Sequence, residues 1–196
     1  MTSGNHRPAR AGVRAICFDA FGTVVEIVDK RRPFRALLSE RPSGELSNQV
    51  LTQRLDLRSV AALLSVELDA DRLAELEQDL QAEIASILLR DGIAEIWRKL
   101  RGEGIKIGIC SNLAMPYGPP LVGSLPDKPD ALVLSYEVGL AKPDPAIFHL
   151  VCDKLGLPPA EILFVGDTPS ADVDGPKAIG MPSMHISGFF RTFANR

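Results

Sequence analysis

From Ile105 onward the sequence alternates between short apolar runs and amphipathic segments, and this alternation constrains the fold more than any other feature. The apolar runs, which we expect to be strands, cover residues 105–110, 131–134, 162–165 and 183–186. Segments with helical spacing of apolar residues lie between the later runs, at 145–155 and 170–179. Near-continuous apolar strands that alternate with helices are typical of a parallel sheet covered on both faces. The sequence therefore predicts an α/β fold, a Rossmann-like parallel sheet core with helices on both faces.

One further strand is expected at residues 14–18, and a long helical stretch separates it from Ile105. Apolar residues recur at three- and four-residue steps in 57–64 and in 73–89, with Asp71 as the expected cap of the second helix. Another amphipathic helix is expected from Asp91 to the glycines that precede Ile105, and residues 115–129 are expected to form a loop. A chain of 196 residues has room for one core with an inserted helical segment of this length.

Charge and composition exclude several classes of function. The 22 Lys and Arg against 25 Asp and Glu give no basic surplus, which argues against nucleic-acid binding. No apolar run approaches the roughly 20 residues of a membrane helix, and the polar residues 1–14 do not resemble a signal peptide. Three widely spaced cysteines, Cys17, Cys110 and Cys152, indicate neither a disulfide framework nor a zinc site. We therefore expect a cytoplasmic protein with buried thiols, and the sequence leaves its oligomeric state open.

Polar side chains follow the expected strands at their carboxyl ends. Asp19 comes directly after the first strand, Ser111 and Asn112 follow the second, Lys142 comes after the third, and Asp167 follows the fourth. In an open α/β sheet, ligands bind beyond the carboxyl ends of the strands. We therefore expect carboxylates, a hydroxyl and a lysine to meet at one edge of the sheet.

These segments resemble the motifs of the haloacid dehalogenase superfamily of hydrolases. The carrying strings are FDAFGTV at 18–24, CSN at 110–112, AKPDPAIF at 141–148 and FVGDTPSAD at 164–172. The resemblance covers the chain from about Arg14 to Ile186, and residues 28–89 correspond to the family's inserted helical cap. It implies a catalytic core of residues 1–27 and 90–196 with a small all-helical cap at 28–89.

The resemblance also implies roles for single residues. Asp19 matches the carboxylate that attacks the substrate and forms a covalent intermediate, which water then opens. Thr23 and Ser111 offer hydroxyls to the transferring oxygens, Asn112 completes that motif, and Lys142 offsets the charge of Asp19 and of an anionic substrate.

An Mg²⁺ site is implied by the family's fourth motif. Its direct ligands would be Asp19, the backbone carbonyl of Phe21 and Asp167, and Asp172 would bind the ion directly or through water. Asp174 is expected to lie on a solvated helix face.

Phe21 departs from the phosphatase pattern, in which a second aspartate protonates the leaving group and later activates water. The family's 2-haloacid dehalogenases also carry an aromatic residue at this position, but they use no metal and place a Tyr where this chain has Phe148. They bind halide with a cap arginine, and Arg54 is the candidate for that residue here. The phosphonate hydrolases of the family need a cap lysine, and none occurs between Arg31 and Arg98.

The retained acidic residues favour an Mg²⁺-dependent hydrolase of a phosphorylated small molecule. Without an acid at Phe21, we expect an anionic substrate with a good leaving group, such as an acyl phosphate or a phenol, and slow turnover of ordinary esters. Two alternatives stay open at this point: a 2-haloacid dehalogenase, and a non-catalytic member that binds a ligand or a partner.

Overall fold

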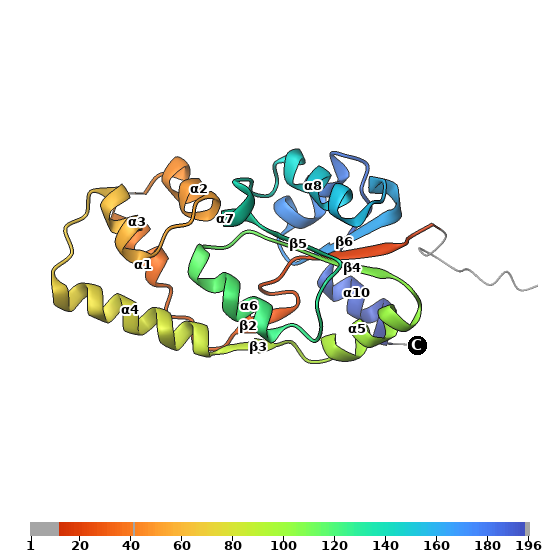
Figure 1. Ribbon diagram of the computed structural model, residues 1–196, viewed down its shortest axis with the longest axis horizontal. Coiled ribbons are helices and arrows are strands. Elements are labelled where there is room, and N and C mark those ends of the chain that lie inside the picture. The colour runs from red at the N-terminus through yellow and green to blue at the C-terminus, as the bar shows by residue number, and fades with distance from the viewer. Residues whose placement is uncertain (1–11, 41, 195–196) are drawn as a thin grey trace, which may run out of the picture.

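The computed structural model describes residues 12–40 and 42–194, and its centre is a five-stranded parallel sheet (Figure 1). The strand order is β5-β4-β1-β6-β7. The strands are β1 (Ala15–Phe18), β4 (Lys106–Ser111), β5 (Ala131–Leu134), β6 (Ile162–Gly166) and β7 (Ser183–His185). Each pairing is parallel, which confirms the predicted fold class and places each expected strand to within a residue or two at either end.

Alternating side chains of the central strand serve the two faces of the sheet. Ile16 and Phe18 belong to one hydrophobic cluster, which includes residues of α5 (Ile93–Gly102) and α10 (Ile186–Ala194). Ala15 and Cys17 belong to a second cluster, which includes residues of α8 (Pro145–Leu155). Figure 1 shows α8 on one side of the sheet and α5 and α10 on the other. This two-sided cover buries β1 and fixes the direction in which the chain leaves it.

The remaining elements of the core are short. They are η1 (Met115–Tyr117), α6 (Gly118–Ser124), α7 (Ser135–Val138), η2 (Pro159–Glu161), η3 (Pro169–Asp174) and α9 (Gly175–Lys177). The expected loop at 115–129 therefore contains η1 and α6, because prolines in the first turns of both start helices readily. The helix expected at 170–179 is instead a π-helical turn, η3, continued by α9.

Four helices lie between β2 (Val25–Ile27) and β3 (Ile87–Leu89). They are α1 (Pro33–Glu40), α2 (Gly44–Thr52), α3 (Leu57–Leu64) and α4 (Ala70–Ala85), and they share a hydrophobic cluster to which the sheet strands contribute no buried residue among those described. Asp69, not Asp71, caps α4, because its side chain accepts the backbone N–H of Arg72.

The helix α4 ends at Ala85, so the prediction that it continues to residue 89 was wrong for residues 86–89. Residues 87–89 form β3, which pairs antiparallel with β2, so the two chain segments that lead into and out of the four helices run side by side. Ser86 lies between the end of helix α4 and the start of strand β3. Its Oγ donates to the Glu83 carbonyl and accepts the N–H of Asp29. Three consecutive apolar residues fit a helix face and a short strand equally well, so spacing alone could not separate them.

The three cysteines are buried free thiols, as the sequence predicted. Burial raises the pKa of Cys110 to about 12, so this side chain stays a neutral thiol at physiological pH. Within the described part of the chain, no helix combines the length and the apolar character that a bilayer crossing would need.

Candidate active site

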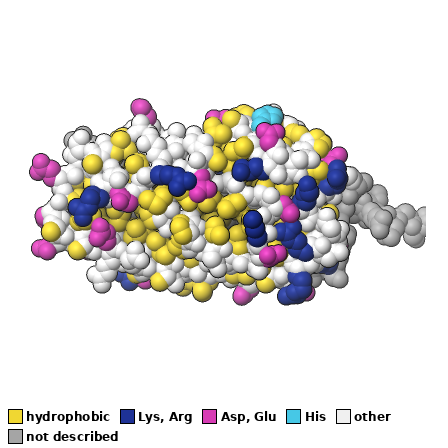
Figure 2. Space-filling model, in the orientation of Figure 1, with side chains coloured by type: hydrophobic (Ala, Val, Ile, Leu, Met, Phe, Trp, Pro, Cys, Tyr) yellow, Lys and Arg dark blue, Asp and Glu magenta, His cyan; other side chains and the backbone are white. Residues whose placement is uncertain are grey.

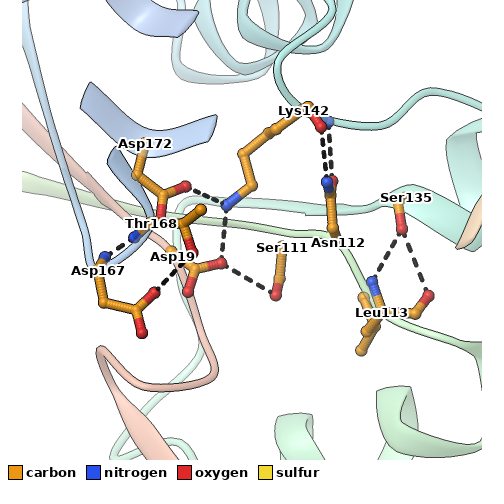
Figure 3. A network of polar contacts seen from close by, with 9 residues as sticks. All are labelled: Asp19, Ser111, Asn112, Leu113, Ser135, Lys142, Asp167, Thr168 and Asp172. Carbon is orange, nitrogen blue, oxygen red and sulfur yellow. Dashed lines mark hydrogen bonds and ion pairs between the residues drawn. The ribbon is translucent and has the colours of Figure 1, made fainter. Parts of the chain in front are cut away.

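The polar residues that follow the strands meet at the carboxyl edge of the sheet (Figure 3). Asp19 follows β1, Ser111 ends β4, and Lys142 comes from the loop before α8. Asp167 follows β6, and Asp172 lies one turn later in η3. The parallel order of the strands brings together residues that are up to about 150 positions apart in the sequence.

Lys142 lies at the centre of this cluster and neutralises two carboxylates. Its Nζ is 2.7 Å from Oδ1 of Asp19 and 2.7 Å from Oδ1 of Asp172, and all three side chains are at least nine-tenths buried. Burial acts to lower the pKa of Lys142, but the two carboxylates outweigh it and raise the pKa above its ordinary value. Lys142 is therefore charged at neutral pH and holds both acids in place.

Asp19 is oriented from two sides. Oδ1 accepts hydrogen bonds from Nζ of Lys142 at 2.7 Å and from Oγ of Ser111 at 3.2 Å, and the Asp19 N–H donates to the Val165 carbonyl at 2.8 Å. Burial raises the pKa of this carboxyl, Lys142 opposes the rise, and Asp172 adds to it. The side chain is thus a fixed, poorly hydrated carboxylate, which is a suitable state for a nucleophile.

Asn112 supports the site through the backbone of Lys142. Its Nδ2 donates to the Lys142 carbonyl and its Oδ1 accepts the Lys142 N–H, each at 2.8 Å. Ser135 supports the backbone of Leu113, the residue after Asn112, in the same way. Its Oγ accepts the N–H of Leu113 and donates to the Leu113 carbonyl. Asn112 is therefore a positioning residue in this structure, and Ser135 is a positioning residue that the sequence analysis did not name.

Asp167 and Asp172 have different surroundings. Both oxygens of Asp172 are engaged, Oδ1 by Lys142 and Oδ2 by the N–H groups of Asp167 and Thr168. Asp167 is half-buried and reaches over the turn after β1, where a Cβ on Gly22 would lie 2.2 Å from Oδ2 of Asp167. Gly22 also has a φ of +83°, so both its backbone angle and its lack of a side chain are required here.

The carboxylate set fits a magnesium ion. Asp19, Asp167 and Asp172 each offer an oxygen, and these atoms lie within 4.8 Å of one another. Mg²⁺ binds oxygen ligands and takes few of them from protein. Because Asp172 is already occupied by Lys142 and two N–H groups, Asp19 and Asp167 suit direct ligation, and Asp172 suits contact through water.

Phe21, at the position where phosphatases of the resembled family carry an acid, lines two cavities. One has a volume of about 330 Å³ and is lined by Gly22, Glu26, Lys30 and Asp167 besides Phe21 and Ile27. The other is apolar, with a volume of about 300 Å³. The Phe21 ring packs edge-on against Tyr117 with centroids 6.0 Å apart. Lys30 was missed by the sequence analysis because it lies in a linker, where no motif marks it.

Thr23 and Arg54 make no hydrogen bond or ion pair with the polar cluster among the described residues. The Thr23 hydroxyl is buried and has no hydrogen-bond partner among the described residues. The guanidinium of Arg54 is 3.4 Å from Glu137 and lies over the Tyr136 ring at 5.7 Å, with a largely exposed side chain. Phe148 is fully buried in the core against Phe164, and Asp174 is exposed beside Lys177.

Arg90 is a further residue without a sequence motif. It follows β3, and its Nη1 donates to the Gly22 carbonyl at 2.7 Å while its backbone N–H donates to Val24. Arg90 thus joins the returning linker to the turn that carries Phe21.

Comparison with known proteins agrees with this geometry. The N-acetylmuramic acid 6-phosphate phosphatase of Pseudomonas aeruginosa is 27% identical over 169 residues, covering 81% of this chain and 75% of the relative. The phosphoglycolate phosphatase of Yersinia pestis is 34% identical over 91 residues, but the match covers only 45% of this chain and 39% of that enzyme. A HAD family enzyme from Bacteroides thetaiotaomicron has the same fold, with a TM-score of 0.67 at 17% identity over 89% of this chain and 93% of that one. A model of the haloacid dehalogenase-like hydrolases matches residues 13–180, and the chain belongs to this family.

Proposed function

We propose that this hydrolase is an Mg²⁺-dependent phosphatase of a small phosphorylated molecule, with Asp19 as its nucleophile. The observation that carries the proposal is the buried cluster in which Lys142 holds Asp19 and Asp172 while Asp167 completes a set of three carboxylates. A dehalogenase that works without a metal would not need Asp167 beside Asp19 as a second metal ligand. The two phosphatases described above, which are relatives of this chain, support the same reading.

The proposed reaction has two steps. An oxygen of Asp19 attacks the phosphorus atom, the bond from phosphorus to the leaving oxygen breaks, and that oxygen departs with the electron pair. Water then attacks the aspartyl phosphate, which releases phosphate, restores the Asp19 carboxylate and gives a proton to the solvent. In this proposal Lys142 holds Asp19 in the attacking orientation, and the Ser111 hydroxyl, which now donates to Asp19, turns to a phosphate oxygen when the substrate binds. A bound Mg²⁺ would supply positive charge against the phosphate oxygens.

The proposed organisation follows the chain. Residues 28–89 act as the cap, joined to the core of residues 1–27 and 90–196 through β2 and β3. We also propose that the protein works in the cytoplasm, a reducing compartment in which its free cysteines stay thiols. A role of Arg54 in binding an anionic substrate requires its guanidinium to leave Glu137.

The proposal is tested by phosphate release from an aryl phosphate such as 4-nitrophenyl phosphate, with Mg²⁺ and with excess chelator. We expect release with Mg²⁺ and its loss on chelation, with recovery when Mg²⁺ is restored in excess. A parallel assay measures chloride release from 2-chloropropionate without metal. Chloride release, or phosphate release that ignores chelation, would overturn the proposal. Binding of phosphate without any turnover would instead favour a non-catalytic member.

Phe21→Asp is expected to restore the missing proton transfer. General acid–base catalysis contributes roughly 10²–10⁴-fold. We therefore expect kcat/KM, which reports the first step alone, to rise by about 10²-fold for an alkyl phosphate, whose leaving group needs a proton, and to change little for 4-nitrophenyl phosphate. Phe21→Leu, which removes the ring without adding an acid, is the matched control. Equal effects of the Asp variant on both substrates would contradict the assignment of Phe21 as the missing acid.

A further inference from the structure

A second cavity shares Phe21 and Ile27 with the cavity that Lys30 and Asp167 line. It has a volume of about 300 Å³ and lies between the first two cap helices and the loop after β4. Its lining residues are Phe21, Ile27, Phe34, Leu38, Ser47, Val50, Leu51, Asn112, Leu113, Ala114 and Tyr117. Two of them adjoin the catalytic cluster, since Phe21 is two residues after Asp19 and Asn112 directly follows Ser111. The cavity therefore borders the site already described.

The lining of this cavity is unsuited to a phosphate group. None of its lining residues carries a formal charge at neutral pH, and the amide of Asn112 is already used at both ends by the backbone of Lys142. A phosphate or a polyhydroxylated group here would lose its water and find few replacement partners besides the hydroxyls of Ser47 and Tyr117, which is unfavourable. The lysine, the carboxylates and the serine that suit a phosphate lie on the Asp19 side.

Aromatic side chains shape the cavity instead. The Tyr117 ring lies 6.0 Å from the Phe21 ring at an angle of 80°, and 6.0 Å from the Phe34 ring at an angle of 54°. These rings come from the nucleophile turn, the core loop and the cap, so the cavity exists only where the three meet. Edge-on contacts of this kind are ones that a further aromatic ring can extend.

We propose that this cavity receives the leaving group of the substrate, and that this group is an apolar aromatic alcohol. The inference rests on the proposed phosphatase function and adds the substrate class. It joins two observations: the cavity favours an apolar ring, and the absence of an acid at Phe21 favours a leaving oxygen that departs without a proton, as a phenolate does. Phe21 thus lines the apolar cavity and also leaves the site without a proton donor at this position.

The test compares kcat/KM for three phosphate compounds in the presence of Mg²⁺. Phenyl and 2-naphthyl phosphate have leaving groups of similar acidity but different apolar area, and acetyl phosphate has a good leaving group with little apolar area. Each apolar addition that a pocket accepts changes kcat/KM by about tenfold. We expect 2-naphthyl phosphate to exceed phenyl phosphate by about tenfold in the wild-type protein.

Leu51→Gln places a polar group in the cavity from α2, and Leu63→Gln makes the same change on α3 at a leucine that is 36% exposed and outside the cavity. We expect Leu51→Gln to lower kcat/KM for 2-naphthyl phosphate about tenfold more than for acetyl phosphate, and Leu63→Gln to keep the wild-type ratio. Leu38→Gln, on α1, repeats the test from a second helix if Leu51→Gln does not fold.

The outcomes separate the two proposals. Phosphate release from all three compounds without a preference for the naphthyl ester, or an unchanged ratio in Leu51→Gln, overturns the leaving-group inference and leaves the phosphatase function intact. Release from none of them, acetyl phosphate included, overturns the proposed function and the inference with it.

Discussion

Asp19→Asn is expected to lower the rate of phosphate release by at least about 10⁴-fold, because the amide cannot attack phosphorus. We expect no loss of thermal stability. The buried cluster holds two carboxylates against one ammonium group, so removal of one carboxylate leaves a balanced pair of Lys142 and Asp172. Burial also raises the pKa of Asp19, which means that its charged form is unfavourable in the folded protein. Steady-state phosphate release and a melting curve measure the two effects.

Asp174→Asn is the matched control for this variant. Asp174 is an exposed carboxylate at the end of η3 and is paired only loosely with Lys177, at 3.7 Å. The Asp174→Asn variant should release phosphate at the wild-type rate. Activity in Asp19→Asn above about one per cent of wild type would exclude Asp19 as the nucleophile. A large fall in its melting temperature would show that the cluster needs both acids for folding.

Lys142→Met is expected to cost about 3–5 kcal/mol in the free energy of unfolding, because it leaves two buried carboxylates without their cation. Because the pKa of Lys142 is raised in the folded protein, its contribution to the free energy of unfolding is fully present at any pH below the ordinary lysine pKa of about 10.4. This contribution is lost only at higher pH. In the variant, burial and the charge of Asp172 raise the pKa of Asp19 with no ammonium group to oppose them, so the folded state takes up a proton more readily than the unfolded chain. The loss of stability should therefore shrink as the pH falls below neutral.

Urea denaturation at several pH values measures this loss. Lys177→Met removes a lysine whose side chain is 58% exposed, and it should change the free energy of unfolding by less than about 0.5 kcal/mol. A similarly small effect for Lys142→Met would mean that the buried ion pairs contribute little to stability. A pH-independent loss would point to packing of the lysine stem rather than to charge.

The strands and the residues at their ends were open to prediction from the sequence. Asp19, Ser111 and Asp167 each follow a short apolar run, and the topology of a parallel sheet brings such positions together. The motif predicted Lys142 and its charge interaction with Asp19. It did not predict the second contact, between Lys142 and Asp172. That second contact depends on η3, whose π-helical turn has no spacing signal that distinguishes it from an α-helix.

Other parts of the site depend on side-chain contacts that no local pattern reveals. Ser135 and Arg90 act on backbone groups of distant residues, Leu113 and Gly22, and each looks like an ordinary surface residue in the sequence. The change from α4 to β3 at Ser86 was missed because its three apolar residues suit both structures. The role of Arg54 depends on the position of the cap, which loop lengths alone do not determine.

The pairing of β2 with β3 has a consequence for how such a protein can diversify. The chain leaves the core and returns to it along one short antiparallel ladder, with Val25 opposite Leu89 and Ile27 opposite Ile87. Entry and exit points this close allow a segment to be exchanged without moving the sheet or the residues at its edge. The intervening helices can therefore be lengthened, shortened or swapped, and a graft made at these two strands would change the part of the apolar cavity that α1 and α2 line while leaving the strand-end carboxylates in place.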